Sequence, residues 1–168
     1  LYRLVDAVDN DNSKGEFSLT DIIGLAREDN IDCTVVEASA EELQGVNSRS
    51  DLAEAEAFWQ ARRRRQVMEG GVTLTDPSTV YFSYDTHLET DVMVGPNVVF
   101  GTGVMVGQGA EIKPFCHLEG VKIGADAAIG PFARLRPGTV MGPGVRIGNF
   151  VEVKNAVFGE GAKASHLS

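Results

Sequence analysis

Cysteine is scarce in this sequence, and long apolar runs are absent. Cys33 and Cys116 are the only two cysteines in 168 residues, and they argue against a disulfide framework or a cysteine-based zinc site. No apolar run can cross a membrane and no signal peptide is recognisable, so we expect a cytoplasmic protein without a membrane partner. Basic residues are also scarce. The 15 basic residues face 24 acidic ones, and the net charge of −9 argues against general nucleic-acid binding.

The second half of the chain contains a six-residue repeat. An aliphatic or aromatic anchor returns at every sixth position, apart from two five-residue steps. The residue two places before each anchor is usually small, and the residue after it is often glycine. Neither a helical nor a strand period produces this register, so it marks a structural repeat. The anchors are Phe82, Leu88, Val94, Phe100, Val106, Ile112, Leu118, Ile123, Ile129, Leu135, Met141, Ile147, Val153, Phe158 and Ala164.

A repeat of this kind predicts a left-handed parallel β-helix. Three short strands then make one triangular coil, and successive coils stack about 4.8 Å apart. The anchors line a narrow core and the small residues fill the crowded corners. Cys116 and Thr139 both occupy small positions, which indicates packing rather than nucleophilic chemistry.

The first half differs in composition, and we divide the chain into three parts. Residues 1–49 contain two short helical patterns and a buried strand near residues 33–37, which suits the C-terminal piece of an α/β domain. Residues 50–71 form a linker helix that ends at two glycines. Residues 72–168 form the β-helix. Because residue 1 is not methionine and the sequence stops within a coil, we expect an internal fragment of a longer protein.

The linker helix carries four consecutive arginines, Arg62 to Arg65. Such a cluster can bind phosphate or nucleic acid. However, consecutive residues on a helix point in different directions, and acidic residues flank the run. We therefore expect solvated arginines that pair with nearby charges. Trp59 is expected to pack the helix against a neighbouring domain.

Arg136 and Lys154 each follow an anchor directly, and one full coil separates them. They are predicted to lie side by side on adjacent strands, where two cations repel each other unless an anion lies between them. Arginine offers a two-pronged donor and lysine a point charge, which together suit a phosphate. The alternative, equally open at this point, is that Glu152 or the glutamates of a neighbouring subunit neutralise the pair.

His166 and Asn47 are further candidates, and plainer explanations stay open for both. Histidine is the natural general base for an amine or hydroxyl, but His166 is explained as well by a solvated surface position. Asn47 can offer a carbonyl oxygen to Mg²⁺ or can simply serve a turn. Together with His87 and His117, His166 also suggests a zinc-dependent carbonic anhydrase as an alternative function. The wide spacing of the three histidines disfavours that function.

Several segments, taken in order, resemble one family. Together they are similar to the bacterial bifunctional N-acetylglucosamine-1-phosphate uridyltransferase/glucosamine-1-phosphate acetyltransferases, and the resemblance covers essentially the whole chain. It implies the end of a uridyltransferase domain, a linker helix and the first part of a β-helix acetyltransferase domain. The segments are Gly15–Ile23, Gly45–Arg49, Ile129–Gly138, Gly148–Lys154 and Lys163–Ser168.

The resemblance also implies an activity and residue roles. The family acetylates the amine of glucosamine-1-phosphate with acetyl-CoA, then couples N-acetylglucosamine-1-phosphate to UTP, giving UDP-N-acetylglucosamine for peptidoglycan and lipopolysaccharide. Arg136 and Lys154 match positions that hold the sugar phosphate, and His166 matches the general base. Asn47 matches a position that binds Mg²⁺ and the nucleotide sugar. The family's acetyl site forms between the β-helices of a homotrimer, and we expect the chain alone to be inactive in both reactions.

Two other functions are compatible with parts of the sequence. One is a sugar-phosphate nucleotidyltransferase whose β-helix is purely structural, although such a β-helix has no need for stacked cations at Arg136 and Lys154. The other is a non-catalytic trimerising scaffold. The uridyltransferase-like segments in the first half speak against it.

Overall fold

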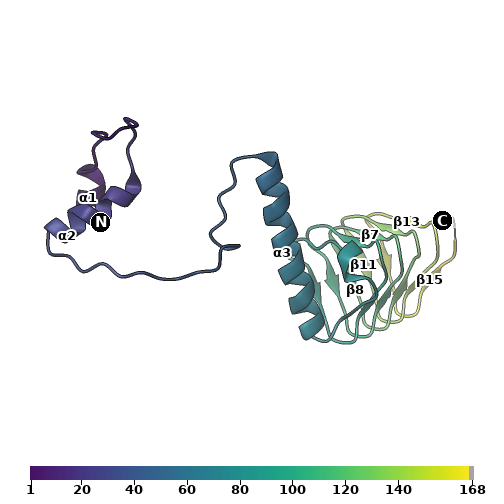
Figure 1. Cartoon of the computed structure of the whole chain (residues 1–168). Coiled ribbons are helices and arrows are strands. Elements are labelled where there is room, and N and C mark those ends of the chain that lie inside the picture. Colours follow the sequence, from purple (N-terminus) through teal and green to yellow (C-terminus); the bar gives the residue numbers. More distant parts are fainter. Residues whose placement is uncertain (167–168) are drawn as a thin grey trace. The chain divides into compact units, whose positions relative to one another are not determined.

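The computed structural model describes residues 1–166, so Leu167 and Ser168, which end the last of the resembling segments, lie outside the described residues. The chain divides into two compact units, Leu1–Gln44 and Gly45–Ser168. Figure 1 labels the elements of both. No helix within residues 1–166 has the length and apolar character needed to cross a membrane.

The first unit consists of short helical elements joined by irregular segments. An ion pair between Arg3 and Asp29 links its first and last helices, and Leu4 and Ala26 are its buried apolar side chains. The elements are α1 (Tyr2–Asp6), η1 (Leu19–Asp21) and α2 (Ile22–Glu28).

The buried strand predicted near residues 33–37 is wrong. This segment belongs to no strand, Cys33 is exposed, and Val35 and Val36 are each 86% exposed. A strand needs a neighbour to receive its backbone hydrogen bonds, and every strand of the described chain lies at Thr73 or beyond. An apolar run without a partner strand therefore stays outside any sheet.

α3 (Arg49–Glu69) is the predicted linker helix, and a capping box fixes its start. The Ser48 hydroxyl accepts a hydrogen bond from the Asp51 N–H, while the Asp51 carboxylate accepts the Ser48 N–H at 2.9 Å. Hydrogen bonds from the Asn47 N–H and from Ser48 lower the pKa of Asp51. This part of the cap is present above the ordinary carboxyl pKa and is lost as the pH falls through the lowered value.

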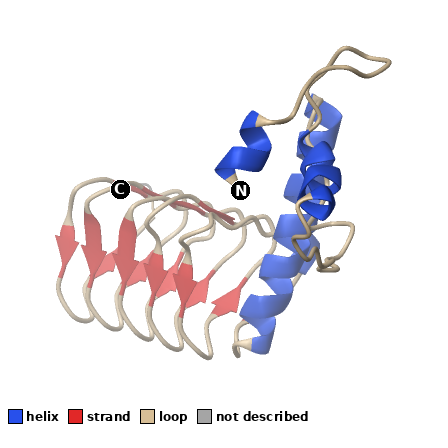
Figure 2. Cartoon of the chain, turned by 90° about the vertical axis from the view of Figure 1, so that its left-hand side faces the viewer, coloured by secondary structure: helices blue, strands red, loops and turns tan. Residues whose placement is uncertain are grey.

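The strands of the second unit wind into a parallel β-helix with three faces, which confirms the predicted fold class. We call the faces sheet A (β1-β3-β6-β9-β12-β15), sheet B (β4-β7-β10-β13) and sheet C (β2-β5-β8-β11-β14). Figure 2 shows strands of one face stacked side by side. The elements are β1 (Thr73–Leu74), η2 (Pro77–Thr79), β2 (His87–Leu88), β3 (Met93–Val94), β4 (Val99–Phe100), β5 (Met105–Val106), β6 (Glu111–Ile112), β7 (His117–Leu118), β8 (Val121–Ile123), β9 (Ala128–Ile129), β10 (Arg134–Leu135), β11 (Thr139–Met141), β12 (Arg146–Ile147), β13 (Glu152–Val153), β14 (Val157–Phe158) and β15 (Lys163–Ala164).

The predicted anchors form one narrow core inside these three sheets. Ile112, Leu118, Ile129 and Leu135 are completely buried, and the small residues between them are buried as well. The five-residue steps shorten a corner without changing the phase of the repeat, because Leu118 still lies opposite Leu135. Since each coil bonds only to its neighbours, the stability of the β-helix is a sum of contacts along its axis.

The arginine run of α3 is not uniformly solvated, which corrects one prediction. Arg63 donates to the Thr86 carbonyl, and Arg64 donates to the Val80 carbonyl at 2.8 Å. Trp59 is packed against the core of the β-helix, as expected. Arg62 and Arg65 are exposed, whereas Arg63 and Arg64 meet carbonyls of the first coil.

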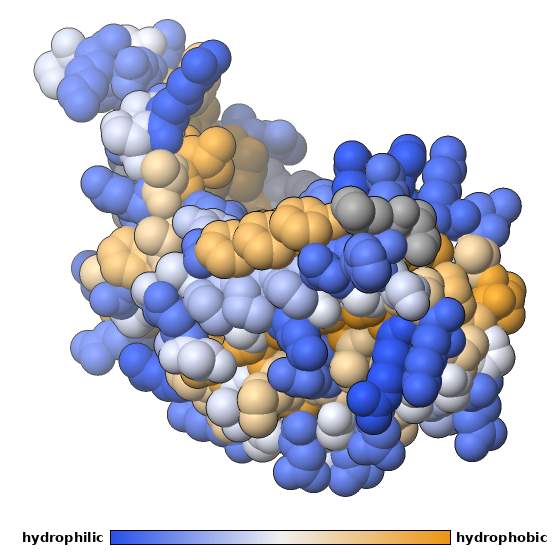
Figure 3. Space-filling view, turned by 90° about the vertical axis from the view of Figure 1, so that its right-hand side faces the viewer, coloured by the Kyte–Doolittle hydropathy of each residue, from blue (hydrophilic) through white to orange (hydrophobic). Residues whose placement is uncertain are grey.

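Three phenylalanines stack in a column at the corner between sheets A and B. The ring of Phe132 lies 4.8 Å from that of Phe115 and 4.9 Å from that of Phe150, centroid to centroid. All three have positive φ, a conformation that costs a non-glycine residue about 1–2 kcal/mol. The rings are roughly half exposed. Figure 3 shows that one face of the molecule carries apolar side chains among the hydrophilic ones. Each stacked pair contributes about 0.5–1.5 kcal/mol, which offsets part of this strain.

Replacing the central ring tests this balance. We expect Phe132→Ala to lower the free energy of unfolding by about 1–3 kcal/mol, because both ring contacts are lost while the positive φ remains. Urea denaturation followed by circular dichroism measures the change. Phe17→Ala is the control, since Phe17 is 71% exposed in the first unit. Equal losses in the two variants would show that the column contributes no stability.

Candidate functional site

Arg136 and Lys154 leave adjacent strands of sheet B at the same edge, as their spacing predicts. β10 and β13 pair in parallel with Arg134 opposite Glu152, and the Arg136 N–H donates to the Val153 carbonyl at 2.8 Å. Continuing this register by two residues places Lys154 opposite Arg136. Side chains at alternate positions of a strand share one face. The four charged side chains therefore lie together on the outer face of sheet B.

The turn after β10 holds the backbone of Arg136 in place. The buried Thr139 donates its hydroxyl hydrogen to the Arg136 carbonyl at 2.8 Å. Gly138 has a φ of +84°, and a Cβ there would come within 2.8 Å of the Asn155 side chain. Thr139, which the repeat assigns to packing, thus also positions a candidate site residue.

Glu152 lies among the cations of this site. Its Oε1 is 3.1 Å from Nη1 of Arg136 and 3.8 Å from Nη1 of Arg134. Lys154 is exposed and forms no ion pair within residues 1–166. Glu119 lies beside Arg136 on the preceding coil, because its N–H donates to the Leu135 carbonyl. The predicted neutralisation by Glu152 therefore holds for Arg136 and leaves Lys154 available to a ligand.

The ion pair between Arg136 and Glu152 is weak enough for a ligand to replace. The two side chains are 38% and 52% exposed, and ion pairs at such exposure contribute only about 0–1 kcal/mol. A phosphate offers more charge and more acceptor oxygens than one carboxylate. Arg134 is a cation of this face that our sequence reasoning missed. The sequence does indicate Arg134 as a site residue, because it lies two positions before Arg136 and alternate residues share one face of a strand.

His166 lies at a different edge of the β-helix and is exposed. It follows β15 of sheet A, and a Cβ on Gly148 of the preceding coil would lie 3.1 Å from the His166 backbone nitrogen. The chain runs from Gly148 across sheet B before it reaches Lys154. The outer face of sheet B therefore separates His166 from the paired cations, and the three predicted residues do not form one cluster.

The zinc alternative finds no support in the geometry. His87 begins β2 of sheet C, His117 begins β7 of sheet B, and His166 follows sheet A. Residues 1–166 contain no group of three or more histidine, cysteine, aspartate or glutamate side chains that could hold a metal ion. Since the three histidines come from three faces, they cannot share one ion.

Asn47 immediately precedes the capping box of α3. Its N–H donates to the Asp51 carboxylate at 2.9 Å, while Ser48 provides the side-chain cap. Asn47 is exposed, so its amide oxygen is open to a ligand. One neutral oxygen does not make a Mg²⁺ site, and no metal-binding group of side chains lies in the described chain.

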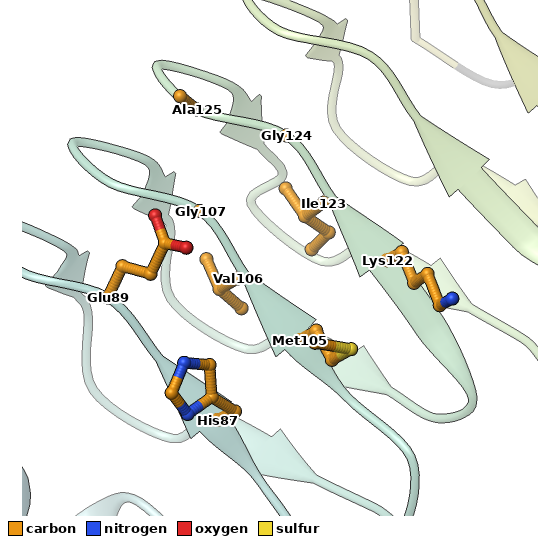
Figure 4. A pocket seen from close by; sticks show the side chains of 9 residues that line it. All are labelled: His87, Glu89, Met105, Val106, Gly107, Lys122, Ile123, Gly124 and Ala125. Carbon is orange, nitrogen blue, oxygen red and sulfur yellow. The ribbon is translucent and has the colours of Figure 1, made fainter.

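An open hollow of about 280 Å³ lies on sheet C. Figure 4 shows His87, Met105 and Lys122 on three successive strands of this sheet, with Glu89 to one side. The Glu89 carboxylate accepts the Gln108 N–H at 2.8 Å. Arg136, Lys154, His166 and Asn47 do not line this hollow. The candidate site is therefore the charged face of sheet B.

Residues 120–155 match the family described as bacterial transferase hexapeptide (six repeats). This stretch contains β10 and β13, and with them both cations of the candidate site. The fold and the match together define the second unit as a hexapeptide-repeat β-helix of the bacterial transferase type.

Sequence relatives identify the family more closely and confirm the resemblance. The chain is 56% identical over 168 residues to the bifunctional protein GlmU of Paramagnetospirillum magneticum, and 53% identical over 168 residues to that of Sphingopyxis alaskensis. All of the chain is matched, but it spans only 37% of the length of each relative. Over its whole length, the chain is similar to one part of these GlmU proteins.

Among solved structures, the chain is similar to the acetyltransferase domain of PglB from Neisseria gonorrhoeae in complex with acetyl coenzyme A. The TM-score is 0.40 and the identity 20%, over 63% of each chain. A second similar structure is a mutant of the GDP-perosamine N-acetyl transferase of Caulobacter crescentus in complex with CoA and GDP-perosamine. Its TM-score is 0.33 and its identity 17%, over 66% of this chain and 62% of that one.

The two cysteines are expected to react at very different rates. Burial raises the pKa of Cys116 to about 11, so its thiolate is rare at pH 8, whereas Cys33 is exposed. With a thiol-reactive disulfide dye at pH 8, one thiol should react quickly and the second only after unfolding in guanidinium. Cys33→Ser should abolish the quick reaction. Rapid reaction of the Cys33→Ser variant would contradict the burial of Cys116.

Proposed function

We propose that this chain carries part of an acetyl-transfer site in a bifunctional enzyme of UDP-N-acetylglucosamine synthesis. The enzyme transfers an acetyl group from acetyl-CoA to the amine of glucosamine-1-phosphate, then a uridylyl group from UTP to N-acetylglucosamine-1-phosphate. The observation that carries the proposal is the pairing of Arg136 with Lys154 on one face of the β-helix. The similarity of the whole chain to GlmU proteins supports the choice of substrates.

Arg136 and Lys154 hold the phosphate of the sugar in this proposal. Arg136 exchanges its exposed carboxylate partner for phosphate oxygens, and Lys154 adds a second charge from the next coil. Their task is positioning, because a fixed phosphate keeps the sugar amine in line with the thioester. Arg134 adds positive charge to the same face and contributes to attraction of the anion.

His166 acts as the general base for acetyl transfer. The amine nitrogen attacks the thioester carbonyl carbon and gives up a proton to the imidazole, the carbon–sulfur bond breaks, and the departing sulfur leaves as the CoA thiol after taking up a proton. No covalent enzyme intermediate is needed, which fits a Cys116 that is buried and protonated. A positioned base of this kind contributes roughly 10²–10⁴ in rate.

The uridylyl step and its Mg²⁺ rest on the family alone. Asn47 would contribute an amide oxygen to the metal and to the nucleotide sugar. Because the described residues supply only this one oxygen, we derive no step through the metal.

The assembly that we propose is a cytoplasmic homotrimer. His166 and the paired cations occupy opposite edges of sheet B within one chain, so a site that closes between neighbouring β-helices suits their placement. Sedimentation equilibrium of the complete protein would give three times the chain mass.

A nucleotidyltransferase with a purely structural β-helix is the second candidate function, and a non-catalytic trimerising scaffold is the third. The exposed Lys154, which forms no ion pair within residues 1–166, distinguishes acetyl transfer from these two functions. A purely structural β-helix gains nothing from an unpaired cation beside Arg136. Activity assays decide between the three functions.

Substitutions in the charged face should change substrate affinity in opposite directions. Arg136→Ala and Lys154→Ala should each raise the KM for glucosamine-1-phosphate about 10–100-fold, because each removes a charge-assisted hydrogen bond to phosphate. Glu152→Gln should lower it a few fold, since the competing carboxylate is gone. Arg146→Ala on sheet A is the matched control and should leave KM unchanged. An unchanged KM in both Arg136→Ala and Lys154→Ala would remove the phosphate site.

Thiol release from acetyl-CoA by the complete protein tests the base. Wild type should release thiol only when glucosamine-1-phosphate is present, and His166→Ala should lower kcat by roughly 10²–10⁴. His87→Ala, which changes an exposed histidine on sheet C, is the control. Full turnover in the His166→Ala variant would exclude the base. No sugar-dependent release by wild type would favour the structural β-helix.

A further inference from the structure

The first coil of the β-helix has a backbone edge without a neighbouring coil in the described chain. Its inner side pairs with the second coil, as Tyr81 N–H donates to the Val98 carbonyl and the Tyr81 carbonyl accepts the Phe100 N–H. The residues on either side, Val80 and Phe82, direct backbone groups the other way, because successive peptide groups of a strand alternate. An uncovered edge of this kind is a template on which another chain can pair.

Gln60 of α3 takes the place of a missing strand at this edge. Its amide nitrogen donates to the Phe82 carbonyl at 2.7 Å, and its amide oxygen accepts the Phe82 N–H at 3.0 Å. These are the two hydrogen bonds that the backbone of a neighbouring strand would supply. The Glu56 carboxylate accepts a further hydrogen bond from the same nitrogen at 2.9 Å, which fixes the orientation of the amide. Gln60 is 2% exposed, so its partners have no water to replace it.

Arg63 and Arg64 cover two further carbonyls of the edge. Arg63 donates to the Thr86 carbonyl, and Arg64 Nε donates to the Val80 carbonyl. The Arg64 guanidinium also lies 5.3 Å from the centroid of the Tyr81 ring. An arginine can only donate, so neither side chain can accept the N–H of an incoming strand.

Apolar residues of α3 close the end of the core beneath these hydrogen bonds. Val67 is buried in the same cluster as Val80 and Phe82, and Trp59 packs against that cluster. The backbone cover and the apolar cover therefore belong to one helix. We call Trp59, Gln60, Arg63, Arg64 and Val67 the edge cap.

We propose that the edge cap prevents the first coil from pairing with the first coil of a second copy of this chain. A repeat protein needs a polar end to stay soluble, and here a helix supplies it. Uncapped, the edge offers a donor and an acceptor at Phe82, acceptors at Val80 and Thr86, and an apolar core end. Such an edge is complementary to itself across a two-fold axis, which makes a second copy the occupant that fits it.

The test compares cap variants of the full chain with wild type. Arg63→Met and Arg64→Met together with Gln60→Met remove the hydrogen bonds but keep apolar bulk. We expect the Phe82 amide to exchange with solvent at least about tenfold faster in dilute solution. Sedimentation velocity should show, on top of any assembly of wild type, a species of twice its mass that disappears on dilution.

Arg65→Met is the matched control, because Arg65 lies on the same helix and is exposed. It should match wild type in both measurements. Slow reaction of Cys116 with the thiol dye checks that the β-helix stays folded, and Arg64→Met alone replaces the triple variant if it does not. A folded variant that keeps the wild-type mass at the highest concentration overturns the proposal. So does the same doubling in Arg65→Met.

Discussion

Backbone hydrogen bonding between successive coils is the constraint on which the rest of the second unit depends. Each strand is only two or three residues long, so no strand is stable without the coils before and after it. From β2 onward the bonds fix a register of 17 or 18 residues between neighbours, as the partners of Arg134 show (His117 before it and Glu152 after it). That register puts the anchors in the core and the charged residues on the outer faces.

The same register explains why this fold can form a charged site from only a few residues. Two residues of one strand and two of the next suffice to bring Arg136, Lys154 and Glu152 together. Loops are not needed, because the strands themselves hold the backbone of the site. The Thr139 hydroxyl secures the turn that follows Arg136. The hydrogen bonds between coils thus fix the position of the site residues, and the outward side chains determine which ligand the site can bind.

Sequence reasoning reached the parts of the molecule that obey this periodicity. The core anchors, the neighbouring positions of Arg136 and Lys154, and the packed state of Cys116 all follow from counting residues. The strand near residues 33–37 failed, because β character in a short run requires a partner that the first unit lacks. The cap formed by Gln60 was also out of reach, since contacts between a helix and a coil end have no period to count.

Contacts that repeat along the axis also depend on one another. The column of Phe115, Phe132 and Phe150 joins three coils through side chains whose backbone conformation favours glycine or asparagine. A glycine at the central position would relax its own backbone but leave Phe115 and Phe150 strained and without a stacking partner. The three positions are therefore epistatic. The effect of a glycine at one position depends on which rings remain at the other two, so these residues should covary across relatives.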